Sequence, residues 1–288
     1  MDIRLGDNQY GKAETRLVRI DRGGERHSIT DLNVSTSLAG DLDATHLTGD
    51  NSGVLPTDTQ KNTVYAFARD GVGEIEDFGL RLARHFVDTT PTITRARVRI
   101  EQYRWERIQV EGAPAPHSFV RAAGTRTATV TYDGARSWVV SGIADVTALN
   151  TTGSEFHGFH RDRYTTLPET TDRILATAVS ARWRHAGESD WAVSYREAHR
   201  HLLEAFADTH SLSLQQTLHA MGERVLRHRD ELVEVRLELP NKHHFLVDLS
   251  PFELDNPGEV FFAADRPYGL IEGSVVRDGA PEPGLAWW

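Results

Sequence analysis

The chain has 288 residues, of which 39% are hydrophobic and 26% charged, and its formal net charge is -10. This composition is typical of a folded globular protein rather than a disordered or fibrous one, and the length allows one large domain or two of ordinary size. The acidic balance argues against nucleic acid as a partner, and the absence of cysteine excludes disulfides and thiolate metal sites.

No apolar leader segment opens the chain, and no run of residues approaches the roughly 18 apolar residues of a membrane span. We therefore expect a cytoplasmic protein without a membrane partner. The chain ends in Trp287 and Trp288 rather than in a Ser-Lys-Leu type of peroxisomal signal, which agrees with that expectation.

The first half of the chain begins with two extended segments, 14–20 and 28–38, on either side of the turn-like residues 21–25. This arrangement predicts a β-hairpin. Residues 40–59 are rich in Gly, Asp, Asn and Thr and are predicted to form a loop. Apolar residues then recur at three- and four-residue spacing over 73–88, a pattern that indicates a helix.

A strand over 95–104 is expected after this helix. Two further strands, 128–132 and 135–143, flank the dipeptide Asp133-Gly134. Because this dipeptide suits the positive φ angles of a type I′ turn, it predicts a hairpin.

The second half repeats this order of elements. Helical patterns cover 191–207 and 211–227, and the second begins at a serine that is suited to capping it. Strands are then predicted over 232–239 and 243–249.

Each half therefore contains a strand pair, a helical layer and a second strand pair. This order predicts an α+β fold in which antiparallel sheets carry their helices on one face. We place the two domains at 1–133 and 134–288. Open antiparallel sheets leave edge strands whose N–H and C=O groups need partners, so association of several chains is expected.

Six motifs occur in order along nearly the whole chain: 8–12, 57–65, 154–159, 161–175, 239–245 and 265–271. Together they resemble the urate oxidase (uricase) family. The resemblance implies two tandem tunnelling-fold (T-fold) domains per chain and a homotetramer that forms a hollow barrel with active sites at subunit interfaces. It also implies oxidation of urate by O2 and water to 5-hydroxyisourate with release of H2O2, a step of purine degradation that needs no cofactor or metal.

The resemblance places a substrate clamp at Arg173 and Gln215, with a main-chain contact from Leu214 beside it. Urate is a planar anion with acceptors and donors on its edges, which suits a guanidinium fork and an amide. Phe156 would supply the flat apolar face on which the purine stacks. Without the resemblance to this family, Phe156 would be interpreted as a core aromatic residue and Arg173 as part of a surface ion pair.

The family's proton relay falls on Lys12, Thr57 and His243. A threonine hydroxyl is a poor base, so it depends on a neighbouring buried amine to accept its proton, and the histidine would pass protons onward through water. By residue type alone, Lys12 would be a surface lysine, Thr57 a loop residue and His243 a structural histidine.

Two more residues match the family's site. Asn241 corresponds to the asparagine that, with Thr57, holds oxygen and then water above the purine plane; an amide N–H can donate there without titrating. Asp58 follows Thr57 as in the family, where a neighbouring subunit delivers this pair. The resemblance therefore implies that an isolated monomer is inactive.

A metal centre is the main chemical alternative. His157 and His160 with Asp162, or His199 with His201, offer imidazole and carboxylate ligands. Histidine pairs arise readily in a chain with 14 histidines, and neither pair has the His-Glu-x-x-His signature. We therefore predict no metal.

A non-catalytic or different-substrate purine- or pterin-binding T-fold protein is the alternative function. A different-substrate enzyme would need a carboxylate anchor, and Glu169 near Arg173 offers one, although a glutamate suits an anionic purine poorly. A binding protein would keep the clamp and lack the relay, whereas Lys12, Thr57 and His243 are all present.

Overall fold

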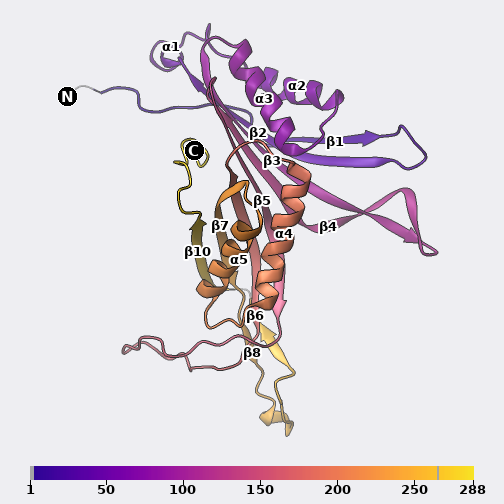
Figure 1. The fold of residues 1–288 in the computed structure, drawn as a ribbon, viewed down its shortest axis with the longest axis vertical. Coiled ribbons are helices and arrows are strands. Elements are labelled where there is room, and N and C mark those ends of the chain that lie inside the picture. Colours follow the sequence, from indigo (N-terminus) through magenta and orange to yellow (C-terminus); the bar gives the residue numbers. More distant parts are fainter. Residues whose placement is uncertain (1–2, 265) are drawn as a thin grey trace. The chain divides into compact units, whose positions relative to one another are not determined.

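The structure is a computed structural model that describes residues 3–264 and 266–288 (Figure 1). The chain divides into two compact units. Unit 1 comprises Met1–Gly142, Arg184–Ala192 and Pro281–Trp288, and unit 2 comprises Ile143–Trp183 and Val193–Ala280. The division at 133 and 134 stays a prediction, and residue 265 of the motif 265–271 lies outside the described residues.

The sheet of unit 1 is built from long antiparallel strands. The predicted opening hairpin is confirmed, because β1 (Thr15–Asp21) pairs with β2 (Ser28–Gly40) without interruption. β3 (Ile93–Val110) and β4 (Ala113–Tyr132) continue the order β1-β2-β3-β4. Both are much longer than predicted, since their pairing runs on to Val110 and Ala113.

The structure places the tight hairpin turn elsewhere than the sequence suggested. Glu111 and Gly112, between β3 and β4, have φ angles of 51° and 80°, as a type I′ turn requires. At the predicted site only Gly134 has a positive φ, of 88°. There the Asp133 carboxylate closes the turn instead, because it accepts the N–H groups of Ala135 and Arg136 at 3.0 and 2.7 Å. The type I′ prediction at 133–134 was wrong, and β5 (Ser137–Asn150) starts after this wider turn.

Three helices of unit 1 lie between β2 and β3. The predicted helix is confirmed as α3 (Ile75–Thr89), but the predicted loop 40–59 was partly wrong. It contains α1 (Asp43–Leu47) and the first turn of α2 (Thr57–Arg69). α2 was not predicted because it buries only Gln60, Val64 and Ala68. Its apolar residues are too few to give a helical periodicity in the sequence.

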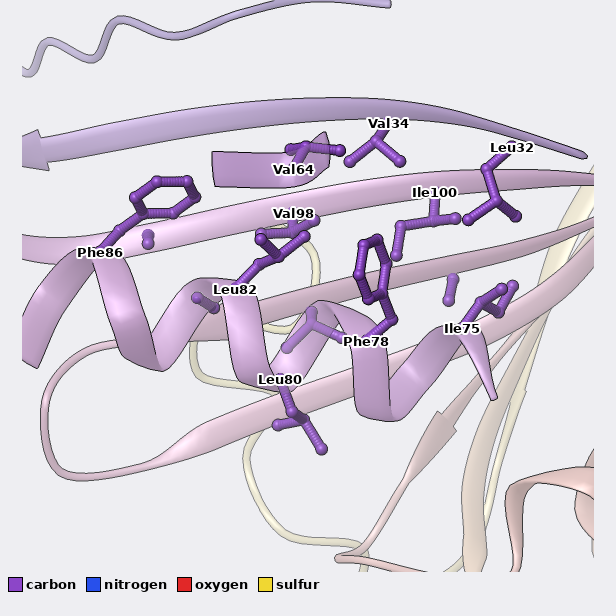
Figure 2. Packing of buried hydrophobic residues seen from close by; sticks show 14 of the residues in the cluster. Leu32, Val34, Val64, Ile75, Phe78, Leu80, Leu82, Phe86, Val98 and Ile100 are labelled. Atoms are coloured by element: carbon purple, nitrogen blue, oxygen red, sulfur yellow. The ribbon is translucent and has the colours of Figure 1, made fainter. Parts of the chain in front are cut away.

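α3 provides the centre of the unit 1 core. Its apolar stripe packs against β3 and β4 and is closed to solvent, together with side chains from β2 (Figure 2). The fully buried apolar residues of this helix are Ile75, Phe78, Leu82, Ala83 and Phe86. At Gly79 the helix lies close to the sheet, since a Cβ there would stand 2.7 Å from Cγ2 of Val130.

Unit 2 repeats the order of elements. β5 ends in it, followed by β6 (Leu175–His185), α4 (Trp191–Asp208), α5 (Leu214–His228), β7 (Leu232–Asn241) and β10 (Gly269–Val276). The small strands β8 (His244–Leu246) and β9 (Phe261–Ala263) pair with each other, and a short 3-10 helix, Ser250–Phe252, lies between them.

Several sequence predictions in unit 2 are refined. The helices are confirmed, but α5 is capped by Ser213 rather than Ser211: the Ser213 side chain accepts the N–H of Gln216. The strand predicted over 243–249 is only three residues long. β6 was not predicted, because it is buried on both faces and therefore lacks the alternation of a half-exposed strand.

α5 has the same role in unit 2 as α3 has in unit 1. It packs on β7 and β10, and a Cβ on its Gly222 would stand 2.6 Å from Cγ2 of Val275. Both units thus place a glycine of the core helix against a valine of a sheet strand, Val130 of β4 and Val275 of β10. The predicted α+β fold, with two repeats of antiparallel sheet and helices, is confirmed. Across the part of the chain that the structure describes, no helix is both long and apolar enough to span a membrane.

We expect Gly79→Val and Gly222→Val each to lower the stability of the protein. The added side chain has no room between helix and sheet, and overpacking of this kind costs about 1–3 kcal/mol or more. Urea unfolding measures the loss. Gly187→Val is the control, because among the described residues nothing lies within 4 Å of a Cβ at Gly187; equal losses in all three variants would contradict the packing argument.

Candidate active site

The segment around Phe156 is held by its neighbours on both sides. The Phe156 N–H donates to the Thr170 carbonyl at 2.8 Å and the Thr170 N–H donates back at 3.0 Å. One residue earlier, the Glu155 N–H donates to the Ser211 carbonyl at 2.7 Å. These bonds join three separate loops of unit 2, so the half-buried ring of Phe156 has a defined position.

Arg173 lies against that ring. Its Cζ atom is 5.3 Å from the centre of the Phe156 ring, and its Nε donates to Oγ of Ser154 at 3.2 Å. Burial lowers the pKa of the guanidinium from its usual value. The structure therefore brings together the predicted stacking residue and the predicted cationic half of the clamp.

Phe159 is a neighbour that the sequence did not reveal as part of this group. Its ring stacks on Phe156 with the centroids 5.0 Å apart and the planes 15° apart. The sequence did contain a signal for this pair, since the two phenylalanines lie three residues apart in the same motif. In this arrangement Phe159 and Arg173 form the aromatic and cationic surroundings of Phe156.

The amide half of the clamp lies at the start of α5. Leu214 is buried as the first helical residue, and Gln215 follows it with an exposed side chain. Within the described ranges 3–264 and 266–288, no hydrogen bond occupies the Gln215 amide. Its donor and acceptor are thus available to a ligand.

Asn241 and His243 lie where β7 ends. Asn241 pairs with Gly269 of β10, and between the two site residues the Lys242 N–H donates to the Ala176 carbonyl at 2.8 Å. Desolvation, then the positive charge of Arg173 and His244, lowers the pKa of His243 below its usual value. The imidazole of His243 is therefore kept neutral and able to accept a proton.

The remaining predicted residues lie in unit 1, beginning with Lys12. The Lys12 N–H donates to Oγ1 of Thr36 at 3.2 Å, and its carbonyl accepts the Thr36 N–H at 2.9 Å. Gly11 allows this approach, because a Cβ there would stand 1.8 Å from the Thr36 carbonyl oxygen. The Thr36 hydroxyl also donates to Oε1 of the buried Gln60 at 2.7 Å. Lys12 is thus connected through β2 to α2.

Thr57 is the first residue of α2, and Asp58 is the second. The loop before them is held by Tyr10, whose hydroxyl donates to the Leu55 carbonyl and accepts the Leu55 N–H, both at 2.9 Å. Bonds to Lys61, and to a lesser extent the charge of Lys12, hold the pKa of Asp58 below its usual range. The segment that carries Lys12 therefore also positions Thr57 and Asp58.

The predicted residues accordingly form two groups. Lys12, Thr57 and Asp58 lie in unit 1, whereas unit 2 holds Phe156, Arg173, Leu214, Gln215, Asn241 and His243.

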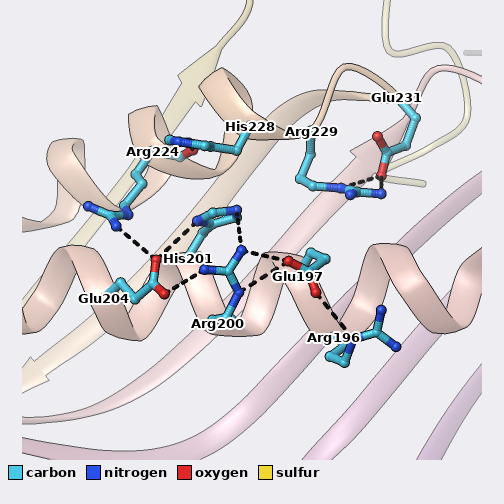
Figure 3. A network of polar contacts seen from close by, with 9 residues as sticks. All are labelled: Arg196, Glu197, Arg200, His201, Glu204, Arg224, His228, Arg229 and Glu231. Carbon is cyan, nitrogen blue, oxygen red and sulfur yellow. Dashed lines mark hydrogen bonds and ion pairs between the residues drawn. The ribbon is translucent and has the colours of Figure 1, made fainter.

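Two of the histidines considered as metal ligands, His157 and His201, have other partners. His157 donates from Nε2 to Oε2 of Glu155, at 2.9 Å. His201 lies 3.3 Å from Glu204, but the carboxylate of Glu204 also binds Arg200 and Arg224, which lower its pKa to about 2 (Figure 3). Among the described residues, no group of three or more His, Asp or Glu is arranged to hold a metal ion.

Comparisons with known proteins agree over nearly the full chain. The model of the Uricase family matches residues 8–131 and 139–272. Uricase of Arthrobacter globiformis is 53% identical over 287 residues, covering 99% of this chain and 94% of the relative. Uricase of Dictyostelium discoideum is 39% identical over 279 residues, covering 95% and 97%.

Solved structures are similar as well. The crystal structure of uricase from Arthrobacter globiformis matches with a TM-score of 0.95 and 52% identity, covering 100% of this chain and 99% of that one. The crystal structure of a uricase from Bacillus fastidious, at 24% identity, matches with a TM-score of 0.80 over 95% and 94% of the two chains. This second likeness shows that the fold persists at low identity.

We expect His243 to titrate below the ordinary histidine value of 6.5. Arg173→Gln removes one of the positive charges and should raise the pKa of His243 part of the way back, because desolvation remains. An NMR titration of the histidine rings, assigned with His243→Gln, measures both values. A pKa at or above 6.5, or one that Arg173→Gln leaves unchanged, would contradict this electrostatic account.

Proposed function

The chain belongs to the uricase family, and we propose that it oxidises urate with O2 at a site formed by the two groups of residues above. Urate oxidase, an oxidoreductase, is the function that the similarity over nearly the full chain supports. In the site itself, the observation that carries the proposal is the guanidinium of Arg173 beside the ring of Phe156.

Urate would bind as a flat anion between donors on its edges. The Arg173 fork suits an edge with acceptors, and the Gln215 amide can donate to one urate atom and accept from another. Stacking on the Phe156 ring would set the plane of the purine, with the main chain of Leu214 beside its edge. The buried positive charge attracts an anion locally, although the chain as a whole is acidic.

The reaction consumes urate, O2 and water and yields 5-hydroxyisourate and H2O2. Urate loses two electrons to O2, and water supplies the new hydroxyl group, so atoms and electrons balance without a cofactor. Thr57 would accept a proton from the substrate side while Lys12 takes the hydroxyl proton. His243, which is kept neutral by its lowered pKa, can receive protons and pass them to water.

Asn241 and Thr57 would hold oxygen, and later water, above the purine. An amide N–H and a hydroxyl stabilise a reduced oxygen species by hydrogen bonds without changing their own charge.

The assembly that we propose is a homotetrameric hollow barrel in which Thr57 and Asp58 of one subunit complete the site of its neighbour. β1 is the end strand in unit 1 and β10 in unit 2, and end strands carry backbone groups that a neighbouring chain can satisfy. We also propose a cytoplasmic location and a division into T-fold domains at 1–133 and 134–288.

The direct test follows the decay of urate absorbance together with oxygen uptake and peroxide release, using purified protein analysed for metals. Urate loss with matching oxygen and peroxide, unaffected by chelators, supports the proposal. Tight urate binding without oxygen consumption would identify a non-catalytic purine-binding protein instead.

We expect Lys12→Met and Thr57→Ala each to lower kcat by roughly 10²–10⁴-fold, the range that general acid–base groups supply. Folding should be intact, because neither side chain belongs to the core. Thr63 is a half-buried threonine of the same helix, so Thr63→Ala is the control and should keep normal turnover. Full activity in both relay variants would refute their assigned roles.

A further inference from the structure

We propose that Ser154 is a positioning residue for urate binding: its hydroxyl holds the Arg173 guanidinium in place and leaves the Nη groups for the substrate. This inference rests on the proposed function, because it assigns a role to a neighbour of the clamp. Nothing in the motif itself distinguishes Ser154 from an ordinary small core residue.

The orientation of the guanidinium follows from one bond. Arg173 donates from Nε to Oγ of Ser154 at 3.2 Å, and its Cζ lies 5.3 Å from the centre of the Phe156 ring. A guanidinium is planar, so a bond at Nε limits its rotation about the side chain and sets the direction of the fork formed by the two Nη groups. Throughout residues 3–264 and 266–288, no hydrogen bond engages either Nη group, which leaves the fork available.

Ser154 is suited to this role because it cannot move easily. Its side chain is fully buried, at 0% exposure. Its backbone lies in a parallel bridge with Ser211, in which the Ser211 N–H donates to the Gly153 carbonyl at 2.9 Å and the Glu155 N–H donates to the Ser211 carbonyl at 2.7 Å.

The same bridge is connected to the other half of the clamp. Oγ of Ser211 donates to the Ser213 carbonyl at 3.1 Å and accepts the Thr217 hydroxyl at 2.8 Å. Ser213 is the residue that caps α5, immediately before Leu214 and Gln215. Ser154 therefore holds Arg173 in a fixed relation to the helix end that carries Gln215.

The choice of a hydroxyl rather than a carboxylate preserves the charge of the clamp. In the part of the chain that the structure describes, Arg173 has no carboxylate within ion-pair distance. A carboxylate would orient the guanidinium equally well, but it would neutralise the positive charge that attracts an anionic substrate. A serine hydroxyl orients the group and leaves its charge uncompensated.

The test is urate kinetics of Ser154→Ala. We expect KM to rise roughly five-fold to ten-fold with kcat within about two-fold, because an interaction used equally in substrate and transition state changes KM alone. Ser154→Cys keeps the volume and lacks a strong acceptor, so it should show the same rise even if the alanine variant folds poorly. Ser154→Thr keeps the hydroxyl and should restore a nearly normal KM.

A double-mutant cycle separates positioning from a general structural effect. If Ser154 acts through Arg173, adding Ser154→Ala to Arg173→Ala should raise KM no further, whereas independent effects would multiply. Ser194→Ala removes another fully buried hydroxyl of unit 2 and should leave the urate KM unchanged.

The outcomes also distinguish this inference from the proposed function. If Arg173→Ala leaves KM unchanged, the clamp itself is wrong. If Arg173→Ala raises KM while Ser154→Ala and Ser154→Cys do not, or if the double variant shows multiplied effects, then the clamp stands and the role of Ser154 is overturned.

Discussion

A cation that binds an anionic substrate loses attraction for it when a carboxylate holds the cation in place, because the carboxylate offsets its positive charge. The arrangement around Arg173 meets this constraint with a hydroxyl at Nε and an aromatic ring near the guanidinium. Burial makes the unpaired charge costly, so the surrounding structure must be rigid enough to keep it in place. The bridge between Ser154 and Ser211 and the capped start of α5 supply that rigidity. The same positive charge acts on His243, where it helps to keep the imidazole neutral.

The scaffold serves the two groups of site residues in different ways. In unit 2 the proposed substrate-binding groups lie at the ends of elements and in loops, and Leu214 and Gln215 among them begin the helix α5, which is anchored by its buried face. In unit 1 the chain before β1 approaches β2 so closely at Gly11 that no side chain fits there. This contact, together with the two hydrogen bonds between the Tyr10 hydroxyl and the Leu55 backbone, connects Lys12 to the start of α2. Stability and site geometry therefore depend on the same close contacts.

Elements with strong local patterns were predicted correctly, and elements without them were not. α3 has a continuous apolar stripe and was predicted nearly to its ends. In contrast, α2 buries three residues and was not predicted, and its first turn was assigned to a loop. β6 is buried on both faces and shows no alternation, so it was missed. The turn at 133–134 was predicted from a favourable dipeptide, but the Asp133 side chain offered a different closure. The site residues were identified through resemblance to a family, since neither spacing nor composition could single out one threonine or one lysine.

By itself, the sequence determined the α+β class, the repeated order of elements, the family and the chemical groups available to the site. These properties depend on local periodicity and on residue identity, both of which can be read directly from the amino-acid sequence. Only the tertiary structure decided which loops meet, because contacts such as Ser154 with Ser211 join residues far apart in sequence. It also decided that a hydroxyl orients Arg173, with no neutralising carboxylate among the residues that the structure describes, and that Phe159 stacks on Phe156. The physical reason is that desolvation, charge and hydrogen-bond direction depend on distance in space, which a linear pattern does not specify.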